Sequence, residues 1–330
     1  MPRFISPVWL RGGHAQTIYP AVFAPRPKVT LYRQRWETPD GDFLDLDFTF
    51  DASLSRPPPQ EDSPKGLIVL FHGLEGSSAS HYAQAAMQAC LDHGWLGVVP
   101  HFRGCSGEDN RSLRTYHSGE TRDIDFILRQ LAMQFPALPT FAIGVSLGGN
   151  ALSKWLGEQG HSATQFIKAA AAFCPPQDLH EGAKALSRGF NLLYMNNFLK
   201  TLKAKAVKKL GQYPGTMHRD RVIASKNFFD FDEEVTAKVN GFASCYDYWE
   251  KSSCKKFLAD VRTPLLLVNP LNDPFLPVQA LARPGQVSRD VKLYYPQHGG
   301  HVGFVQGRFP GHLAWLPRTA LNFFEHGTTP

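Results

Sequence analysis

Residues 140–158, TFAIGVSLGGNALSKWLGE, decide how the rest of the chain is interpreted. The first four residues are typical of a short buried strand, and residues 150–158 have the apolar spacing of an amphipathic helix. Ser146 stands between these segments in the pentapeptide Gly-Val-Ser-Leu-Gly. A strand and a helix joined by so short a turn predict a nucleophile elbow, which holds a serine exposed on a strained backbone. Gly144 and Gly148 support this interpretation, because a Cβ at either position would collide with neighbouring backbone.

The composition is typical of a globular protein with a sizeable core. Hydrophobic residues make up 43% of the 330 residues, which argues against disorder. Lysine and arginine exceed aspartate and glutamate by only 35 to 29, so nucleic-acid binding has little support. Five cysteines without a Cys-x-x-Cys pair predict neither a disulfide framework nor a zinc knuckle.

The sequence shows neither a targeting peptide nor a membrane span. Residues 1–7, MPRFISP, lack the apolar core of a signal peptide. No stretch approaches the ~18 apolar residues that a membrane-spanning helix needs. We therefore expect a soluble, cytoplasmic protein with reduced cysteines.

The order of strands and helices predicts a single α/β domain over residues 1–330. Alternating apolar residues at 29–33 and 43–48 predict an antiparallel hairpin, and residues 56–64 predict a proline-rich surface loop. From Gly66 onwards strands alternate with helices, which predicts a doubly wound, mostly parallel sheet. The expected strands are 67–71, 95–100, 140–143, 167–173, 264–269 and 291–295, and the expected helices are 80–93, 120–134, 150–158 and 313–324.

Residues 176–258 interrupt this alternation and predict a helical cap inserted into the domain. Within it, residues 199–210, LKTLKAKAVKKL, form a basic amphipathic pattern. We expect its apolar stripe to cover a pocket while its lysines face water or anionic lipid headgroups, which would allow peripheral contact with a membrane. The apolar stripe comprises Leu199, Leu202, Ala206, Val207 and Leu210.

A glycine turn ends the strand at 67–71. Residues 71–76, Phe-His-Gly-Leu-Glu-Gly, allow a backbone N–H to point at the serine. We expect the N–H groups of Leu74 and Leu147 to form an oxyanion hole. The alternative is a tight turn with no role in chemistry.

An acid is expected after a later strand of the sheet. Asp273 follows the strand at 264–269, whereas Asp260 and Asp290 precede strands and lie at the wrong ends. A buried carboxylate at Asp273 would orient a histidine and stabilise its imidazolium. The alternative is that Asp273 only caps the turn before the next proline.

Two histidines follow the last strand, in residues 297–304, QHGGHVGF. We favour His301 over His298 as the base, because the preceding glycines let the loop approach the carboxyl edge of the sheet. The resulting chain order of serine, aspartate and histidine is the order found on this kind of sheet. The alternative is that His298 and His301 bind a metal, but neither an HExxH helix nor a third ligand accompanies them. We expect neither a metal nor an organic cofactor.

Motifs along nearly the whole chain resemble the α/β-hydrolase superfamily, which implies the α/β-hydrolase fold. Within it the chain is similar to the AB hydrolase type-4 family of YheT-like bacterial esterases and their eukaryotic lipase relatives. The matching motifs are WLRGGHAQT at 9–17, FHGLEG at 71–76, HFRG at 101–104, GVSLGGN at 144–150, FDE at 231–233, NDP at 272–274 and GGHVGF at 299–304. The resemblance places a catalytic triad on Ser146, Asp273 and His301. It implies hydrolysis of carboxylic esters of small molecules or lipids.

The leading hypothesis is a serine esterase or lipase that forms an acyl-enzyme. The same triad can perform acyl transfer or thioester hydrolysis, which differ only in the acceptor or the ester. An alternative from a different class is a non-catalytic binding module on the same scaffold, since a fold does not determine a function.

Other conspicuous residues are expected to have structural roles. His14 is expected in a small N-terminal segment that packs on the body of the domain. Asp232 and Glu233 are expected to cap a helix or to form ion pairs with the body. We expect Arg103 to be a structural hydrogen-bond donor near the loop carbonyls rather than a clamp for the substrate.

Overall fold

The computed structural model describes residues 3–52 and 64–327, so the loop predicted at 56–64 lies almost entirely outside the described residues. Within these residues the chain forms an eight-stranded sheet in the order β1-β2-β4-β3-β5-β6-β7-β8. The strands are β1 (Tyr32–Glu37), β2 (Phe43–Phe48), β3 (Leu67–Phe71), β4 (Leu96–Pro100), β5 (Thr140–Val145), β6 (Ala170–Phe173), β7 (Leu265–Val268) and β8 (Val291–Tyr294). β1 and β2 form a hairpin, β2 is also antiparallel to β4, and the remaining neighbours are parallel.

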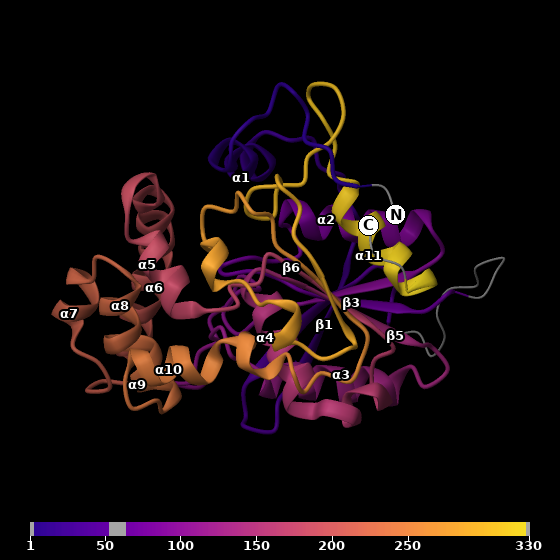
Figure 1. Ribbon diagram of the computed structural model, residues 1–330. Coiled ribbons are helices and arrows are strands. Elements are labelled where there is room, and N and C mark those ends of the chain that lie inside the picture. The colour runs from indigo at the N-terminus through magenta and orange to yellow at the C-terminus, as the bar shows by residue number, and fades with distance from the viewer. Residues whose placement is uncertain (1–2, 53–63, 328–330) are drawn as a thin grey trace.

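Helices cover both faces of the sheet (Figure 1). In β3, Val69 packs with α3 (Arg122–Gln134) and α4 (Leu147–Gln159), whereas Leu70 packs with α2 (His81–Asp92) and α11 (Trp315–His326). Successive side chains of a strand point to opposite faces. A parallel strand covered on both faces is therefore apolar throughout, which explains the unbroken apolar run at 67–71.

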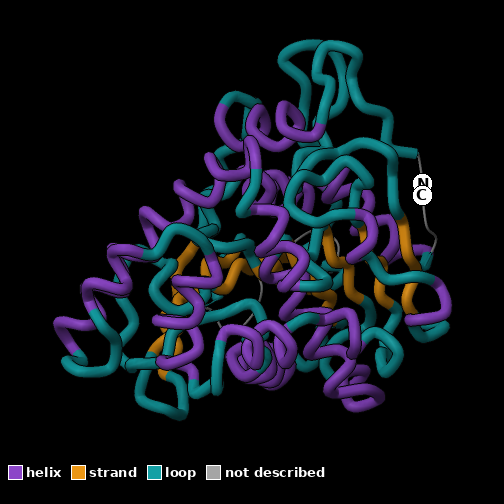
Figure 2. The backbone as a smooth tube through the Cα atoms, turned by 60° about the vertical axis from the view of Figure 1, so that its left-hand side comes forward, coloured by secondary structure: helices purple, strands orange, loops and turns teal. Residues whose placement is uncertain are grey.

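Between β6 and β7 the chain leaves the sheet and forms the inserted helices, residues 176–258. They lie beyond the strands, at the left in Figure 1. Figure 2 shows the strands surrounded by helices and loops. The inserted helices are α5 (Leu179–Leu186), α6 (Leu192–Gln212), α7 (Arg219–Ala224), α8 (Phe228–Phe231), a π-helical turn (Asp232–Thr236), α9 (Ala237–Asn240) and α10 (Cys245–Ser252). Met195, Leu199 and Phe231 belong to an apolar core of their own.

The boundaries of β1, α4 and α6 differ from the prediction. The predicted strand at 29–33 begins only at Tyr32, because Val29 and Leu31 pack against the core beneath α2 and α11 instead. α4 begins at Leu147, earlier than the predicted helix at 150–158, since one residue suffices for the turn. α6 extends beyond the predicted helix at 199–210 at both ends. Among the described residues, no helix combines the length and apolarity needed to cross a membrane.

Candidate active site

Ser146 occupies the turn between β5 and α4. Its backbone has φ 52° and ψ −119°, a region that residues with a Cβ rarely adopt. A Cβ on Gly144 would lie 2.6 Å from the Cα of Gly149, and a Cβ on Gly148 would lie 2.3 Å from the carbonyl oxygen of Phe71. Glycine at both positions is therefore what allows so tight a turn, and the turn presents the serine at the start of α4.

The structure brings Asp273 and His301 to Ser146. His301 Nε2 lies 2.8 Å from Ser146 Oγ, and His301 Nδ1 lies 2.8 Å from Asp273 Oδ2. The Asp273 side chain is 1% exposed, and its other oxygen accepts a hydrogen bond from the Phe275 N–H. A buried carboxylate at Nδ1 favours the tautomer with its proton on Nδ1, which leaves Nε2 to accept the serine proton. The Phe275 ring stacks on the imidazole with centroids 4.1 Å apart and holds its plane.

The loop after β3 places Leu74 beside the serine. Leu74 and Leu147 both line the cavity that Ser146 and His301 line. The N–H groups on either side of Leu74, those of Gly73 and Glu75, donate to tyrosine hydroxyls at 2.8 and 2.9 Å. Across the described part of the chain, no hydrogen bond is found for the N–H of Leu74 or of Leu147. Two such N–H groups next to a serine have the chemistry of an oxyanion hole.

His72, which precedes this loop, has a structural role. Its Nε2 accepts a hydrogen bond from the Phe102 N–H at 3.1 Å, and its Nδ1 donates to the Gly73 carbonyl at 2.7 Å. Burial lowers the pKa of His72 to about 3, so the imidazole stays neutral near pH 7 and keeps both bonds. His72 thus fixes the start of the loop that carries Leu74.

Gln16 and Thr17 hold the loop that carries His301, and sequence reasoning missed both. They belong to α1 (Gly13–Val22), a helix that the apolar pattern did not predict. Gln16 Oε1 accepts hydrogen bonds from the Gly299 N–H and from Asn272 Nδ2, each at 2.9 Å. Thr17 Oγ1 accepts a hydrogen bond from the His301 N–H at 2.9 Å. The available signal was the motif at residues 9–17, which supported the family resemblance but did not indicate which residues Gln16 and Thr17 contact.

The structure also distinguishes the two candidate histidines. His301 contacts the serine, whereas His298 is exposed on the same loop. His14 of α1 forms a 3.2 Å hydrogen bond to Tyr194 of α6, so it joins the N-terminal segment to the inserted helices.

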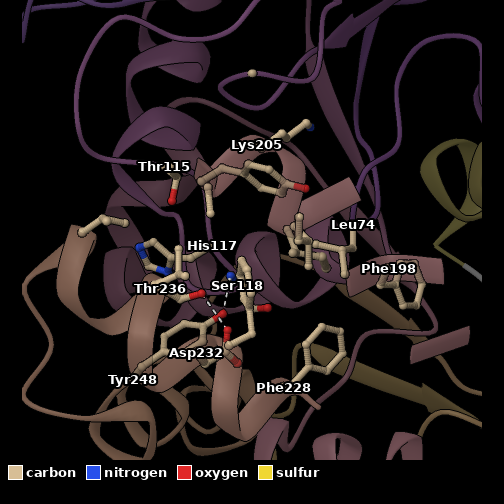
Figure 3. A pocket seen from close by; sticks show the side chains of 18 of the residues that line it. Leu74, Thr115, His117, Ser118, Phe198, Lys205, Phe228, Asp232, Thr236 and Tyr248 are labelled. Carbon is tan, nitrogen blue, oxygen red and sulfur yellow. Dashed lines mark hydrogen bonds between the residues drawn. The ribbon is translucent and has the colours of Figure 1, made fainter. Parts of the chain in front are cut away.

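A cavity lies next to Ser146, between the loops at the sheet edge and the inserted helices (Figure 3). Its wall on the side of the inserted helices is mostly apolar. The apolar lining residues are Leu179, Ala183, Leu186, Phe198, Leu202, Met217, Phe228, Phe231, Val235, Val239 and Phe275. A group of polar residues interrupts this wall, namely Thr115, His117, Ser118, Asp232, Thr236 and Tyr248. The cavity can therefore hold a large apolar group beside the serine.

Asp232 lies in the cavity wall, where it caps no helix and forms no ion pair with any residue that the structure describes. Its carboxylate accepts hydrogen bonds from Thr236 Oγ1 at 2.6 Å and from Trp249 Nε1 at 2.8 Å. Burial raises the pKa of Asp232 to about 6. For Asp232 the expectation of a cap or an ion pair was wrong, because its side chain is buried and bonds to Thr236 and Trp249 instead. Glu233 accepts a hydrogen bond from the Cys245 N–H at the start of α10, as a capping residue does.

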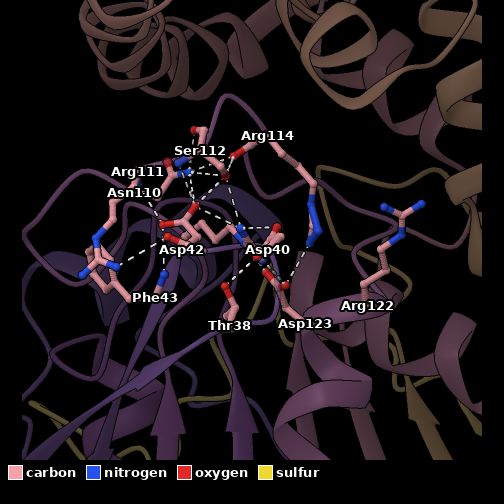
Figure 4. A network of polar contacts seen from close by, with 12 residues as sticks. Thr38, Asp40, Asp42, Phe43, Asn110, Arg111, Ser112, Arg114, Arg122 and Asp123 are labelled. Carbon is pink, nitrogen blue, oxygen red and sulfur yellow. Dashed lines mark hydrogen bonds and ion pairs between the residues drawn. The ribbon is translucent and has the colours of Figure 1, made fainter.

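Arg103 lies at the centre of a buried charge network, most of which is labelled in Figure 4. Its guanidinium contacts Asp40 and Asp42 at 2.9 Å and Asp123 at 2.8 Å. Arg103 is a structural donor as expected, but its acceptors are carboxylates rather than loop carbonyls, because a buried guanidinium needs charge compensation that carbonyls do not supply. The network joins the β1–β2 turn to α3 below the loop at 103–114.

Three lysines of α6 bond to the body of the domain, and one of them, Lys208, lies 3.3 Å from Asp109 while its side chain stays exposed. Lys209 Nζ donates to the carbonyls of Asn110 and Ser112 at 2.6 and 2.8 Å, and Lys205 Nζ lies 2.7 Å from Glu75. The expectation that the lysines of residues 199–210 face water or lipid headgroups was wrong for Lys205 and Lys209. The spacing of apolar residues in a helix shows which face is polar, but it does not show whether another segment of the chain packs against that face.

One group of residues near the serine has donor atoms close enough for a metal ion. Cys174 Sγ, an Asp273 oxygen and a His301 nitrogen lie within 4.8 Å of one another. Burial raises the pKa of the Cys174 thiol well above its usual value, which keeps it protonated. Both nitrogens of His301 are already hydrogen-bonded to Asp273 and Ser146, so a metal ion here would replace those bonds.

Comparison with known proteins identifies the family. The family model described as the alpha/beta hydrolase fold matches residues 66–308. A relative named "Putative esterase YheT", from Escherichia coli K12, is 39% identical over 92% of this chain and 87% of its own length. "Phospholipase ABHD3" from Bos taurus is 28% identical over 97% of this chain and 78% of its own. The esterase Pf2001 from Pyrococcus furiosus shares the fold, with a TM-score of 0.55 at 15% identity over 98% of each chain. The chain belongs to the alpha/beta hydrolase fold family and is a hydrolase.

Proposed function

We propose that this hydrolase cleaves carboxylic esters with Ser146 as the nucleophile. The observation that carries the proposal is the hydrogen-bonded chain from Ser146 Oγ through His301 to Asp273, with two distances of 2.8 Å. A serine hydroxyl becomes nucleophilic when a base within hydrogen-bond reach takes its proton and a third group orients that base. The names of an esterase and a phospholipase among the relatives support ester hydrolysis.

The geometry suggests how acylation proceeds. His301 Nε2 accepts the proton as Ser146 Oγ attacks the carbonyl carbon of the ester. Negative charge then develops on the carbonyl oxygen, where the N–H groups of Leu74 and Leu147 stabilise it. Asp273 stabilises the imidazolium. When the tetrahedral intermediate collapses, His301 returns the proton to the departing alcohol and the acyl group remains on Ser146.

Deacylation repeats these steps with water in place of the serine. His301 takes a proton from water as the water oxygen attacks the carbonyl carbon of the acyl-enzyme. It then gives the proton to Ser146 as the carboxylic acid leaves. Every proton transfer uses the same nitrogen, Nε2, because Nδ1 stays bound to Asp273. The proposed reaction needs no metal or organic cofactor.

The cavity favours an ester with a long hydrocarbon chain. Side chains from α5, α6 and α8, including Leu186, Phe198 and Phe228, face the space next to Ser146. Burying one methylene stabilises a bound ligand by about 0.8 kcal/mol, which is roughly a fourfold gain in affinity. We therefore propose lipid esters as substrates, and the phospholipase among the relatives agrees with this choice.

Labelling by a fluorophosphonate tests the nucleophile. We expect labelling and ester hydrolysis in the wild type and in Ser162→Ala, whose serine is exposed and remote from the described cavity lining. Ser146→Ala should lose both, with hydrolysis falling by at least about 10³-fold. Labelling that persists in Ser146→Ala would refute the assignment of the nucleophile.

A series of p-nitrophenyl esters of increasing acyl length tests the substrate class. We expect kcat/KM to rise severalfold with each added methylene until the apolar wall is filled. The lipid-ester proposal would be refuted by a maximum at the acetate ester, while the assignment of the nucleophile would stand.

A further inference from the structure

The loop at residues 73–75 is held by two tyrosine hydroxyls. Tyr82 Oη accepts a hydrogen bond from the Gly73 N–H at 2.8 Å, and Tyr116 Oη accepts one from the Glu75 N–H at 2.9 Å. Both tyrosines are buried, and burial raises the pKa of each, so the hydroxyls stay protonated. The N–H between these two anchors is that of Leu74, which lines the cavity beside the serine. The direction of that N–H therefore depends on how the two flanking residues are held.

Glu75 needs particular support, because it has a left-handed backbone with φ 54°. A residue with a Cβ rarely adopts this conformation unless its surroundings impose it. Tyr116 contacts Glu75 twice: its oxygen accepts from the Glu75 N–H, and its hydroxyl proton is donated to Glu75 Oε1 at 2.7 Å. The Tyr116 ring is itself fixed by stacking on Phe102, with centroids 5.5 Å apart.

The remaining contact comes from the inserted helices. Lys205 Nζ of α6 lies 2.7 Å from the same oxygen, Glu75 Oε1, across 130 residues of sequence. The Glu75 side chain is 13% exposed and that of Lys205 is 34% exposed, so water competes only weakly for this ion pair. Lys203, two residues earlier on α6, instead donates to the Ile223 carbonyl of α7. Figure 3 shows Lys205 and Leu74 around the same cavity.

We propose that Lys205 is a positioning residue: through Glu75 it holds the Leu74 N–H in the oxyanion hole, so that α6 completes the active site. The inference rests on the proposed function. Lys205 contacts neither Ser146 nor His301 by hydrogen bond in the described structure, and it acts on the transition state only through the loop. It should therefore affect the step in which charge develops on the carbonyl oxygen rather than the binding of the ester.

Steady-state kinetics of Lys205→Met, with Lys203→Met as the matched control, test this inference. Removing one oxyanion donor costs about 10²–10³ in kcat, so displacing one should cost roughly 10- to 100-fold. We expect Lys205→Met to lower kcat by this amount with KM within about twofold of wild type, and Lys203→Met to keep both. Lys205→Arg, which can still pair with Glu75, should recover most of kcat. An unchanged kcat in a folded Lys205→Met protein would overturn the proposal.

A trifluoromethyl ketone with an alkyl chain separates positioning from general damage to the site. Ser146 adds to this ketone and forms a tetrahedral oxyanion, so its inhibition constant reports the oxyanion hole. We expect Lys205→Met to weaken this inhibition by the same factor as kcat/KM while a fatty acid product binds as in wild type. Equal weakening of both ligands would overturn the proposal and indicate a merely structural role.

A second variant keeps the test valid if Lys205→Met does not fold. Glu75→Gln keeps the oxygen that Tyr116 contacts but removes the charge, and we expect it to lower kcat by at least about threefold. Full activity in Glu75→Gln would overturn the proposal. The proposed function fails separately, since it is refuted when Ser146→Ala retains wild-type hydrolysis, whatever the Lys205 variants do.

Discussion

Gly148 is the residue on which the turn around Ser146 most directly depends. A Cβ there would lie 2.3 Å from the Phe71 carbonyl oxygen and 2.5 Å from that of His72. Both are backbone atoms at the end of β3, so neither can move without shifting the loop that carries Leu74. We expect Gly148→Ala to lower the free energy of unfolding by about 1–3 kcal/mol, as overpacking does. It should also remove most ester hydrolysis, because it separates α4 from the loop after β3.

Gly211 provides the control for this substitution. It lies in α6, and apart from its chain neighbours and the backbone of α6 itself no atom of the described chain lies within 4 Å of a Cβ at this position. Since alanine favours a helix over glycine, Gly211→Ala should raise the free energy of unfolding by up to about 1 kcal/mol. Urea unfolding followed by circular dichroism measures both variants. Equal stability of Gly148→Ala and wild type would show that β3 and α4 are not packed as closely as the structure has them.

At the scale of elements, α1 acts as a support for the loop that carries His301. Gln16 is 3% exposed and accepts hydrogen bonds from the Gly299 N–H and from Asn272, the residue directly before Asp273. Leucine at position 16 fills a similar volume but leaves both donors without this acceptor. We expect Gln16→Leu to cost about 1–3 kcal/mol of stability, as an unsatisfied buried group does, and to lower kcat at least tenfold.

The exposed face of the same helix supplies the comparison. Ala15 is exposed, so Ala15→Gln should change neither stability nor kcat beyond a few tenths of a kcal/mol. Stopped-flow or steady-state hydrolysis at fixed pH measures kcat, and thermal unfolding measures stability. If Gln16→Leu lost stability but kept wild-type kcat, α1 would be only a packing element.

The sheet and the tight turn that carries Ser146 were predictable because their signals are local. Apolar runs report strands covered on both faces, and the small residues around Ser146 report one tight turn. The supports of the site were not predictable in this way. Gln16 is 283 residues from Gly299, and Lys205 is 130 residues from Glu75. Such contacts depend on how whole elements pack, and residue periodicity carries no information about the partner of a single polar side chain.

At the scale of the whole molecule, buried titratable groups act on stability in opposite directions. Burial lowers the pKa of His72 and His117 to about 3 and that of His81 to about 4. Their ordinary pKa is 6.5, so the stability gained by keeping them neutral is complete above pH 6.5 and is lost as the pH falls below it. Burial raises the pKa of Asp232 to about 6 and that of Glu120 to about 7. These two carboxyls hold protons that the unfolded chain releases, so their contribution falls as the pH rises from about 4.5 to 7.

The two sets largely cancel between pH 6 and pH 4.5, where unfolding takes up protons on the three histidines and releases protons from the two carboxyls. We therefore expect the free energy of unfolding to change only slowly with pH in this interval. As the pH falls below the ordinary carboxyl pKa values of 3.8 and 4.5, the unfolded chain also holds these two protons, so the opposing contribution of the carboxyls disappears and the loss of stability should become steeper. Urea unfolding between pH 4 and pH 8 measures this curve. Asp232→Asn removes one opposing group while Asn still accepts the Trp249 N–H, so it should be more stable than wild type above pH 7 and lose that advantage as the pH falls to 4. A constant difference between the two proteins across this range would mean that Asp232 does not carry its proton in the folded state.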